Sequence, residues 1–292
     1  MTVTTDQLVA QAHSLLERLE KIIPSASLTE FAWNDAQAFR WNHSQHILQP
    51  VANFQRIALT DLLSIDNQKQ RIQQNTLQFV RGGMANNVLL SGARGTGKSS
   101  LVKALLNEYA ELGLRVIQID KQGLVDLPLI IGLVQGRSER FILYCDDLSF
   151  NADEPGYQAL KAALDGDLVT FSDNLLIYAT SNRRHLMPDY MQENLATKYI
   201  GDEIHPAESV EEKVSLSERF GVWISFYPFS QDEYLDVAAH WLQHYGWQQG
   251  MTEEVRGEAL RWSLSRGSRS GRVACQFARD WCGSRFIAKP VA

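Results

Sequence analysis

The sequence has few cysteines and no long apolar stretch. Its 292 residues include three cysteines, Cys145, Cys275 and Cys282, which form neither a disulfide framework nor a zinc-ligand set, so we expect a reducing cytoplasm. The longest apolar run, Leu127–Val134, is too short to span a bilayer. The N-terminal residues lack the basic, apolar and small-residue order of a signal peptide. These absences predict a soluble, cytoplasmic protein that does not bind a membrane.

Positive charge is also in short supply. The chain has 28 lysines and arginines against 34 aspartates and glutamates, a formal net charge of -6, and its pI is about 5.7. An acidic chain of this kind has no overall attraction to nucleic acid or to anionic membranes. Hydrophobic residues make up 45% of the sequence, so the chain can form one large or two ordinary domains with a substantial core.

The most informative stretch is Asn87–Leu106, whose pattern indicates a strand, a glycine-rich turn and the start of a helix. Within it, residues 92–99 read GARGTGKS and fit the phosphate-binding pattern G-x-x-x-x-G-K-[ST]. Glycines let successive N–H groups turn into one concavity, and the helix that begins there favours phosphate oxygens. Lys98 is placed to reach the β- and γ-phosphates of a nucleotide, and the Ser99 hydroxyl to bind Mg²⁺. The nucleotide-binding residues predicted in this loop are Gly92, Ala93, Arg94, Gly95, Thr96, Gly97, Lys98, Ser99 and Ser100.

A second motif puts two acids at the end of another apolar run. Residues 141–145 are followed directly by Asp146 and Asp147. A parallel strand would carry Asp146 to the edge of the phosphate loop, where its carboxylate holds Mg²⁺ directly or through water. Because Mg²⁺ keeps several waters, Ser99 and Asp146 are a sufficient predicted metal site. Asp147 is then placed to orient or polarise the attacking water.

Five apolar segments separated by helical patterns predict a five-stranded parallel sheet in an α/β fold. They are residues 88–90, 115–120, 141–145, 175–180 and 222–227. Ahead of them, residues 57–80 contain a short link and an amphipathic helix with Ile72 and Phe79 on its buried side. After Pro228 no strand pattern returns, and residues 231–245, 253–264 and a helix starting near Gly271 predict a helical lid.

The N-terminal part has a helical stripe over residues 6–23, which predicts a helix packed on the main domain and also fits a coiled-coil seam of about two heptads. An aromatic-rich link follows, which we expect to pack on a neighbouring core; partner recognition is the alternative. His43 and His46 have i, i+3 spacing, but no third ligand accompanies them in the sequence, so we expect no metal there. The predicted division is a helical extension over residues 1–55, an α/β domain over 56–228 and a lid over 229–292.

The order of the motifs resembles that of an AAA+ ATPase: phosphate loop, acid pair, ATSN at 179–182, SERFG at 217–221, then a helical lid. The segments ARGTGKSSLVKALL, CDDLSF, YATSNRRHL, EKVSLSERFG and FYPFSQDEYL are similar to those of an uncharacterised bacterial family of predicted ATP-binding proteins. The likeness extends from about Phe39 to the C-terminus. It implies a P-loop NTPase fold of AAA+ type with ATP and Mg²⁺ as ligands, and it implies no substrate.

The resemblance also implies roles for further residues. Asn182 matches the sensor-one residue, which positions the attacking water or contacts the γ-phosphate. Arg219 matches the arginine finger, which in this superfamily usually reaches the nucleotide of a neighbouring subunit; a cation that satisfies helix carbonyls is the simpler alternative. Arg272 matches the sensor-two arginine of the lid, with Arg269 as a close alternative. Ile65 matches the linker that lies against adenine.

Two departures from the AAA+ pattern limit the expectation. Most AAA+ hydrolases have Asp-Glu where this chain has Asp146-Asp147, so nucleotide binding is expected more firmly than fast hydrolysis. No pore loop of the protein-unfolding type is present between the second and third predicted strands, which argues against an unfoldase. The lid is rich in arginine, which is one feature of a nucleic-acid surface, but solvated helix faces are favoured because the whole chain is acidic. These arginines are Arg256, Arg261, Arg266, Arg269, Arg272, Arg279 and Arg285.

The predicted function is therefore a Mg²⁺-dependent ATPase that acts as a homo-oligomeric switch or remodelling enzyme on an unidentified protein client. Nucleic acid remains a less favoured partner. Two alternatives stay open: a nucleotide-locked adaptor that hardly turns over, and a P-loop kinase that phosphorylates a small molecule. A kinase would require an acceptor, whereas the adaptor would bind ATP without releasing phosphate.

Overall fold

The computed structural model describes residue 33 and residues 36–150, 154–165, 173–182, 198–200, 203–205 and 216–287. The helix predicted over residues 6–23 lies outside this set. The strands are β1 (Ala38–Asn42), β2 (Ile47–Pro50), β3 (Val88–Gly92), β4 (Leu114–Ile119), β5 (Arg140–Cys145), β6 (Leu175–Ser181), β7 (Lys198–Ile200), β8 (Glu203–His205) and β9 (Val222–Phe226). The α-helices are α3 (Asp66–Val80), α4 (Lys98–Tyr109), α5 (Leu127–Val134), α6 (Pro155–Asp165), α9 (Gln231–His244), α10 (Glu253–Ser265) and α11 (Gly271–Ile287), with 3-10 helices η1 (Leu59–Asp61), η2 (Ala110–Leu112) and η3 (Lys121–Asp126).

The main sheet has seven strands in the order β2-β1-β4-β5-β6-β3-β9. All neighbours in it are parallel except β1 and β2, which form an antiparallel hairpin. The prediction of five parallel strands is therefore wrong in number, although the α/β class is confirmed. Residues 38–50, which we predicted to lie in a helical extension, form the two extra strands. Such short strands are stabilised by distant partners, here β4, and a local pattern does not reveal that pairing. The predicted division into three segments stays a prediction.

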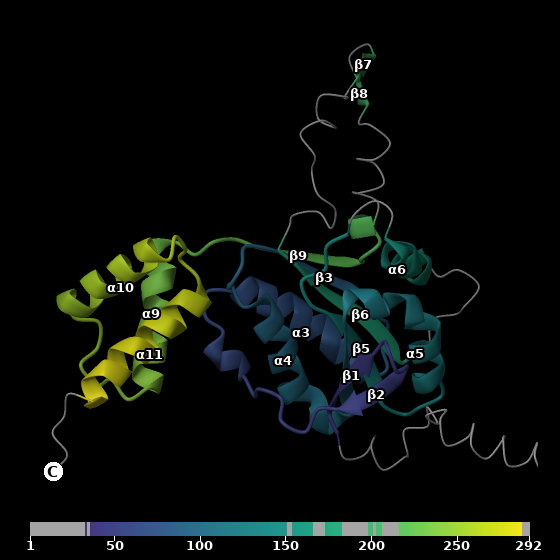
Figure 1. The fold of residues 1–292 in the computed structure, drawn as a ribbon, viewed down its shortest axis with the longest axis horizontal. Helices are drawn as coiled ribbons and strands as arrows, with labels where there is room; N and C mark the ends of the chain where they lie inside the picture. Colours follow the sequence, from purple (N-terminus) through teal and green to yellow (C-terminus); the bar gives the residue numbers. More distant parts are fainter. Residues whose placement is uncertain are drawn as a thin grey trace, which may run out of the picture.

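Alternation along the central strands explains the layers of the fold (Figure 1). In β3, Val88 and Leu90 belong to one buried cluster, which includes α3, α4 and the C-terminal helices. Leu89 between them belongs to a second cluster, which includes α5 and α6 on the other face. Strands buried on both sides have the continuous apolar runs seen in the sequence.

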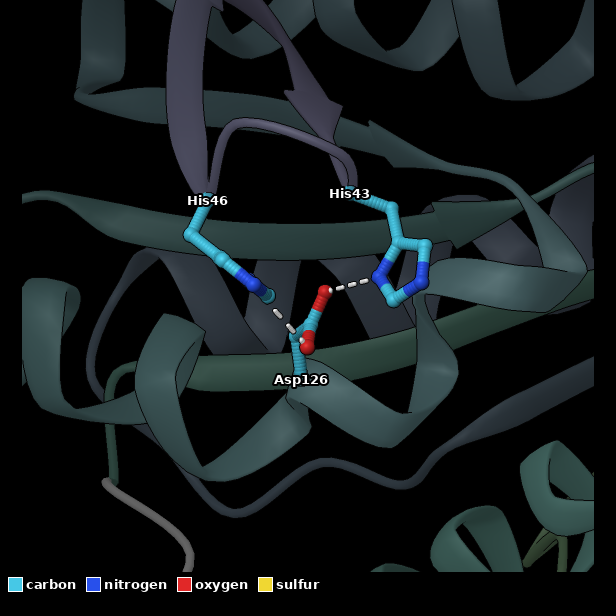
Figure 2. A group of neighbouring side chains, drawn as sticks. All are labelled: His43, His46 and Asp126. Carbon is cyan, nitrogen blue, oxygen red and sulfur yellow. Dashed lines mark hydrogen bonds and ion pairs between the residues drawn. The ribbon is translucent and has the colours of Figure 1, made fainter.

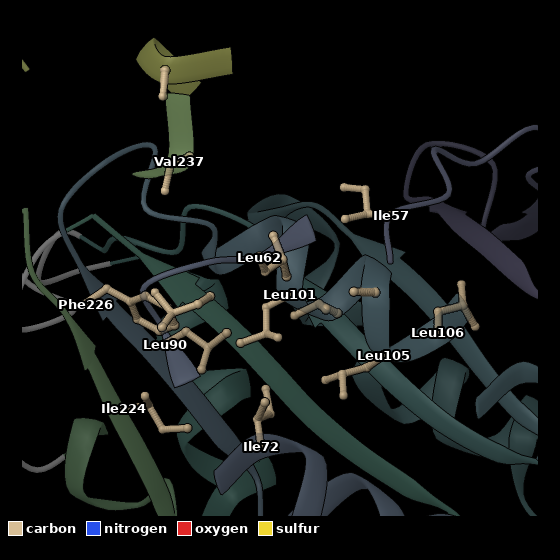
Figure 3. Packing of buried hydrophobic residues seen from close by; sticks show 14 of the residues in the cluster. Ile57, Leu62, Ile72, Leu90, Leu101, Leu105, Leu106, Ile224, Phe226 and Val237 are labelled. Carbon is tan, nitrogen blue, oxygen red and sulfur yellow. The ribbon is translucent and has the colours of Figure 1, made fainter. Parts of the chain in front are cut away.

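Helix α3 is anchored to the sheet by apolar packing and by two buried hydrogen bonds to Tyr178. Ile72 is fully buried, and Figure 3 shows it beside Leu105 of α4 and Ile224 of β9. The Tyr178 hydroxyl on β6 accepts a hydrogen bond from Asn75 at 3.0 Å and contacts the Thr76 hydroxyl at 2.8 Å, so this buried polar atom is satisfied.

The aromatic residues of the link that the structure describes are buried, as expected. Trp33, Phe39 and Trp41 expose 3%, 1% and 3% of their surfaces and belong to the cluster under α5 and α6. Cys145 in β5 is also part of this core, and burial raises its thiol pKa to about 12. None of the described helices is both long enough and apolar enough to cross a membrane.

The C-terminal helices α9, α10 and α11 pack together to one side of the sheet (Figure 1). Helix α9 begins with a capping box, in which the Ser230 hydroxyl accepts from the Glu233 N–H and the Glu233 carboxylate accepts from the Ser230 N–H. This cap fixes where the chain leaves β9 and enters the lid.

Candidate nucleotide-binding site

The loop between β3 and α4 has the conformation that its glycines permit. Gly92, Gly95 and Gly97 have φ angles of 121°, 75° and 102°, a region that side chains with a Cβ rarely adopt. A Cβ on Gly92 would lie 2.0 Å from the Phe226 carbonyl oxygen, and one on Gly95 would lie 2.7 Å from the Ser270 hydroxyl. Both positions therefore require glycine for conformation and for space. The strand, loop and helix predicted over Asn87–Leu106 are confirmed.

Lys98, the first residue of α4, points back into this loop. Its Nζ donates to the carbonyl oxygens of Gly92 at 2.9 Å and Ala93 at 2.7 Å and to Asn182 Oδ1 at 3.1 Å. Only 5% of the residue is exposed. Burial lowers its pKa to about 8, although the charges of Asp147 and Asp146 act in the opposite direction. The site thus holds a poorly solvated ammonium group. Phosphate oxygens would stabilise its positive charge.

Asp146 lies directly across from the start of α4. Its Oδ1 accepts hydrogen bonds from Ser99 Oγ at 2.8 Å and from Thr180 Oγ1 at 2.6 Å. Burial alone would raise the pKa of Asp146, but hydrogen bonds, with that of Thr180 the strongest, hold it below the usual value. The carboxylate is therefore charged at neutral pH, and it stands next to the hydroxyl that we predicted to share a metal with it.

Asp147 adopts an unusual backbone conformation at the same place. Its φ is 52°, in the left-handed region, which is uncommon for a residue with a side chain and is often found at functional sites. Asn182 Nδ2 donates to its Oδ1 at 2.6 Å, and Thr180 Oγ1 accepts from its N–H at 2.9 Å. The Asn182 amide thus contacts Lys98 through its oxygen and Asp147 through its nitrogen, which fixes the orientation of the amide.

These groups line one cavity of about 1040 Å³, at the upper end of the range for small-molecule sites. It brings together most of the predicted site residues: Arg94, Gly95, Thr96, Gly97, Lys98, Ser99, Ser100, Asp146, Asp147, Asn182, Ile65 and Arg272. Gly92 and Ala93 belong to the loop but do not line the cavity. Of the two alternative lid arginines, Arg272 lines it and Arg269 does not.

Arg219 is the predicted catalytic residue that does not line the cavity. It follows residues 216–218 and makes an ion pair with Asp165 at the end of α6, in which Arg219 Nε donates to Asp165 Oδ1. The Arg219 side chain is 24% exposed. Any role for Arg219 in chemistry would therefore concern a nucleotide other than the one bound in its own cavity, and the residue would have to leave Asp165.

Helices α9 and α11 close the cavity from the lid side. The Arg272 N–H donates to the Gly95 carbonyl at 3.2 Å, so the first turn of α11 rests directly on the phosphate loop. The amphipathic lid pattern did not indicate which residues face the nucleotide. The lid residues that line the cavity and were not predicted are Phe229, Val237, Trp241, His244, Tyr245, Gly271, Cys275, Gln276 and Arg279.

Thr180 is a further cavity residue that the sequence did not predict. It lies in β6 beside β5, where Cys145 pairs with Ala179, so Thr180 comes level with Asp146. Knowledge of that register would have identified it, because a hydroxyl next to a carboxylate at the end of adjacent parallel strands is placed to orient it.

The remaining lid arginines mostly have partners within the lid. Arg285 contacts Glu254 at 3.2 Å and lies 3.2 Å from the centre of the Trp281 ring. Arg261 pairs with Glu258, Arg266 lies over the Trp262 ring, and Arg279 donates to the Tyr245 hydroxyl at 3.1 Å. These contacts support the interpretation that the arginines cover helix faces.

The mostly parallel sheet, the glycine-rich loop that opens α4 and the facing acid pair are features of the P-loop fold of AAA+ type. Among solved structures, the chain is similar to the Aeropyrum pernix Orc1 protein in complex with DNA, with a TM-score of 0.54 and 14% identity over 77% of this chain. It is also similar to two mutant forms of Thermotoga maritima RuvB, with TM-scores of 0.43 and 0.42, at 12% identity over 76% and 77% of this chain. The matched region spans 61% of the Orc1 chain and 72% of each RuvB chain. At these identities the likeness concerns the fold alone.

The chain belongs to a family whose description is "protein of unknown function (DUF815)", and the family model matches residues 34–285. No curated protein matches the sequence. The predicted recognition of an uncharacterised family with an AAA+ fold is thus confirmed.

Proposed function

We propose that this chain binds ATP with Mg²⁺ in the cavity between the phosphate loop and the lid, hydrolyses it, and acts as a switch or remodelling ATPase on a macromolecular partner. The observation that carries the proposal is the contact of 2.8 Å between Ser99 Oγ and Asp146 Oδ1. It joins two elements that are separated in the sequence, beside a buried lysine in a cavity of sufficient size. A surface acid pair that merely ends a strand would not meet the P-loop hydroxyl.

The donor set fits Mg²⁺. This ion prefers oxygen ligands at 2.0–2.1 Å in octahedral geometry, so two adjacent ligands lie about 2.9 Å apart. The separation of Ser99 Oγ and Asp146 Oδ1 is 2.8 Å, so the two atoms suit neighbouring positions around one ion. When bound, Mg²⁺ would neutralise charge on the β- and γ-phosphates. Thr180 would keep the Asp146 carboxylate oriented toward that position through its hydrogen bond.

The remaining residues supply binding and water positioning. Lys98 and the loop N–H groups would hold the phosphates, and Lys98 would exchange carbonyl partners for phosphate oxygens. Asp147 would accept a proton from the attacking water, with Asn182 holding that carboxylate in place. Ile65 would lie against adenine, and Arg272 would report the nucleotide to the lid.

Arg219 would act on the nucleotide of a neighbouring copy in a homo-oligomer. Its position outside its own cavity supports a role in trans, and its pairing with Asp165 suggests that the finger is held back in the single chain. In the engaged state the guanidinium would stabilise charge that develops on the transferring phosphoryl group. A protein client is favoured over nucleic acid, because most lid arginines have partners within the chain.

Nucleotide binding and single-turnover hydrolysis by purified variants test this function. We expect Lys98→Ala to abolish binding of ATP, and Arg219→Ala to bind ATP normally while losing hydrolysis. If Arg219→Ala hydrolyses ATP at the wild-type rate in dilute solution, the finger in trans is wrong. If the wild type binds ATP and releases no phosphate in a single turnover, the protein is a nucleotide-locked adaptor. Phosphate transfer that requires an added small-molecule acceptor would identify a kinase instead.

The partner can be sought with a variant held in the ATP state. Asp147→Asn removes the proposed proton acceptor but keeps a side chain that Asn182 can contact, so it should bind ATP and hydrolyse it slowly. We expect this variant with ATP to retain a protein that Lys98→Ala does not retain. Equal retention by both variants would contradict a nucleotide-dependent switch.

A further inference from the structure

The turn between β1 and β2 carries two histidines that meet an acid from a distant segment. We expected no metal at His43 and His46 because the sequence shows no third ligand near them. Asp126, at the end of η3, supplies that ligand (Figure 2), so the premise of the expectation is wrong. One nitrogen of each histidine and one carboxylate oxygen lie within 4.8 Å of one another. It is the only such group of three among the residues that the structure describes.

The Asp126 carboxylate is buried and turned toward this hairpin. Its side chain is 7% exposed, and it contacts His43 Nδ1 at 2.6 Å and His46 Nδ1 at 3.4 Å. Trp41 Nε1 donates to it at 2.8 Å. Although burial acts to raise the pKa of Asp126, hydrogen bonds from His43 and Trp41 hold it below the usual value. The acid is therefore a buried carboxylate, and its ion pairs within the described residues are with the two histidines.

The Asp126 side chain gives up a common local role to reach the hairpin. Asp126 occupies the N-cap position of α5, yet its side chain makes no capping hydrogen bond, although aspartate is among the preferred residues for that bond. Its carboxylate contacts the His43 and His46 side chains instead. His46 has a φ of 50°, in the left-handed region, where histidine is enriched among residues with a side chain.

We propose that His43, His46 and Asp126 bind a late first-row divalent cation, with Zn²⁺ as the representative ion. Two imidazole nitrogens and one carboxylate oxygen are a ligand set typical of Zn²⁺ sites that keep a fourth position for water. Tetrahedral ligands at 2.0–2.1 Å lie about 3.3 Å apart. The His46 nitrogen lies 3.4 Å from Oδ1 of Asp126, and the His43 nitrogen lies 2.6 Å from Oδ2. The two histidines thus contact different oxygens of the carboxylate. Because one ligand atom from each residue lies within 4.8 Å of the others, a modest shift of the histidine rings would let the three residues share one ion.

The two histidines have the freedom to make this adjustment. Their side chains are 44% and 54% exposed, and their rings meet edge to face with centroids 5.7 Å apart. A divalent ion would also balance the buried charge of Asp126. Bound there, it would join the β1–β2 turn to the junction of η3 and α5, two segments that the sequence separates by about eighty residues.

This site is distinct from the nucleotide cavity. None of its three residues lines that cavity, and β4, β5 and β6 lie between β1 and β3 in the sheet. The metal site therefore does not depend on whether the chain hydrolyses ATP. Its role would be to fix the hairpin at the sheet edge, with one coordination position open to water or to a ligand from outside.

Direct zinc binding by the tag-free, metal-stripped full chain tests the proposal. Excess Mg²⁺ keeps Zn²⁺ from the Ser99–Asp146 position. The protein competes with a chromogenic chelator for Zn²⁺, and the absorbance of the chelator reports how much Zn²⁺ the protein has bound. We expect the wild type to bind one Zn²⁺ per chain, and His46→Asn to bind it at least about tenfold more weakly, since loss even of an outer partner costs 10–100-fold. Asparagine tolerates the positive φ at this position, so His46→Asn removes the ligand without straining the turn. His43→Gln should weaken binding similarly.

The matched control is Gln45→Asn, which makes the same kind of exchange one residue away. Gln45 is exposed and contacts Asn42, not Asp126. The Gln45→Asn variant should bind Zn²⁺ as the wild type does. Zinc should also raise the thermal midpoint of the wild type and of Gln45→Asn but not that of His46→Asn. Wild-type protein that takes up no Zn²⁺ at micromolar concentration, or His46→Asn and His43→Gln that bind it as tightly as the wild type, would overturn the proposal.

Discussion

The buried ammonium of Lys98 predicts that nucleotide affinity falls as the pH rises above neutrality. Burial lowers the pKa of Lys98 to about 8 in the free protein, and phosphates bind the charged form. With a pKa of about 8, roughly nine-tenths of Lys98 is charged at pH 7 and roughly one-tenth at pH 9. If only the charged form binds, affinity decreases about tenfold over this range, which corresponds to about 1.4 kcal/mol. The sign follows from linkage, because bound phosphate raises the pKa and binding therefore takes up a proton.

The assay is titration with a nonhydrolysable ATP analogue and Mg²⁺ between pH 7 and pH 9. Lys98→Arg is the matched variant, because guanidinium stays charged throughout this range. Its affinity at pH 7 is expected to differ from that of the wild type, since arginine is larger, but its affinity should not change with pH. A wild-type affinity that is flat from pH 7 to pH 9, or a decline of equal slope in Lys98→Arg, would refute the assignment of Lys98 as the titrating phosphate ligand.

Two further predictions concern the residues around the acid pair and the finger. Asp165→Asn weakens the ion pair that holds Arg219, so the rate of ATP hydrolysis per chain should increase at protein concentrations where the chain self-associates. Steady-state phosphate release measured against protein concentration tests this. An unchanged rate in the associated state would contradict the idea that Asp165 restrains the arginine finger. Thr180→Val removes the hydroxyl that donates to Asp146 at 2.6 Å, so nucleotide binding should require an Mg²⁺ concentration about tenfold higher. If nucleotide binding by this variant depends on Mg²⁺ as it does in the wild type, Thr180 does not orient the Asp146 carboxylate.

The local sequence pattern was sufficient to predict the phosphate loop, because the residues that shape the loop are contiguous in the sequence. The three glycines, Lys98 and the following helix lie within one short stretch, and the conformation that they require is encoded in the same residues. The Asp146 position was predictable for a related reason. Parallel strands end at the same edge of a sheet, so an acid directly after an apolar strand arrives near the loop.

What could not be predicted depends on register and on contacts between distant segments. Thr180 became part of the site through the pairing of β5 with β6, and the sequence does not give the alignment of two strands. The hairpin β1–β2 joins the sheet through β4, and the same contact region brings Asp126 under the His43–His46 turn. The lid residues around the cavity depend on how α9 and α11 are rotated, which an amphipathic pattern defines only approximately.

The hydrogen bond from the Arg272 N–H to the Gly95 oxygen joins the lid to a residue of the loop that we propose to hold phosphate. The free space there is smaller than a methyl group, since an added Cβ would come within 3.2 Å of the Arg272 side chain as well as meeting Ser270. If the loop adjusts to a phosphate as proposed, α11 would have to move with it or lose this hydrogen bond. The proposal therefore couples the angle of the lid to the occupancy of the cavity.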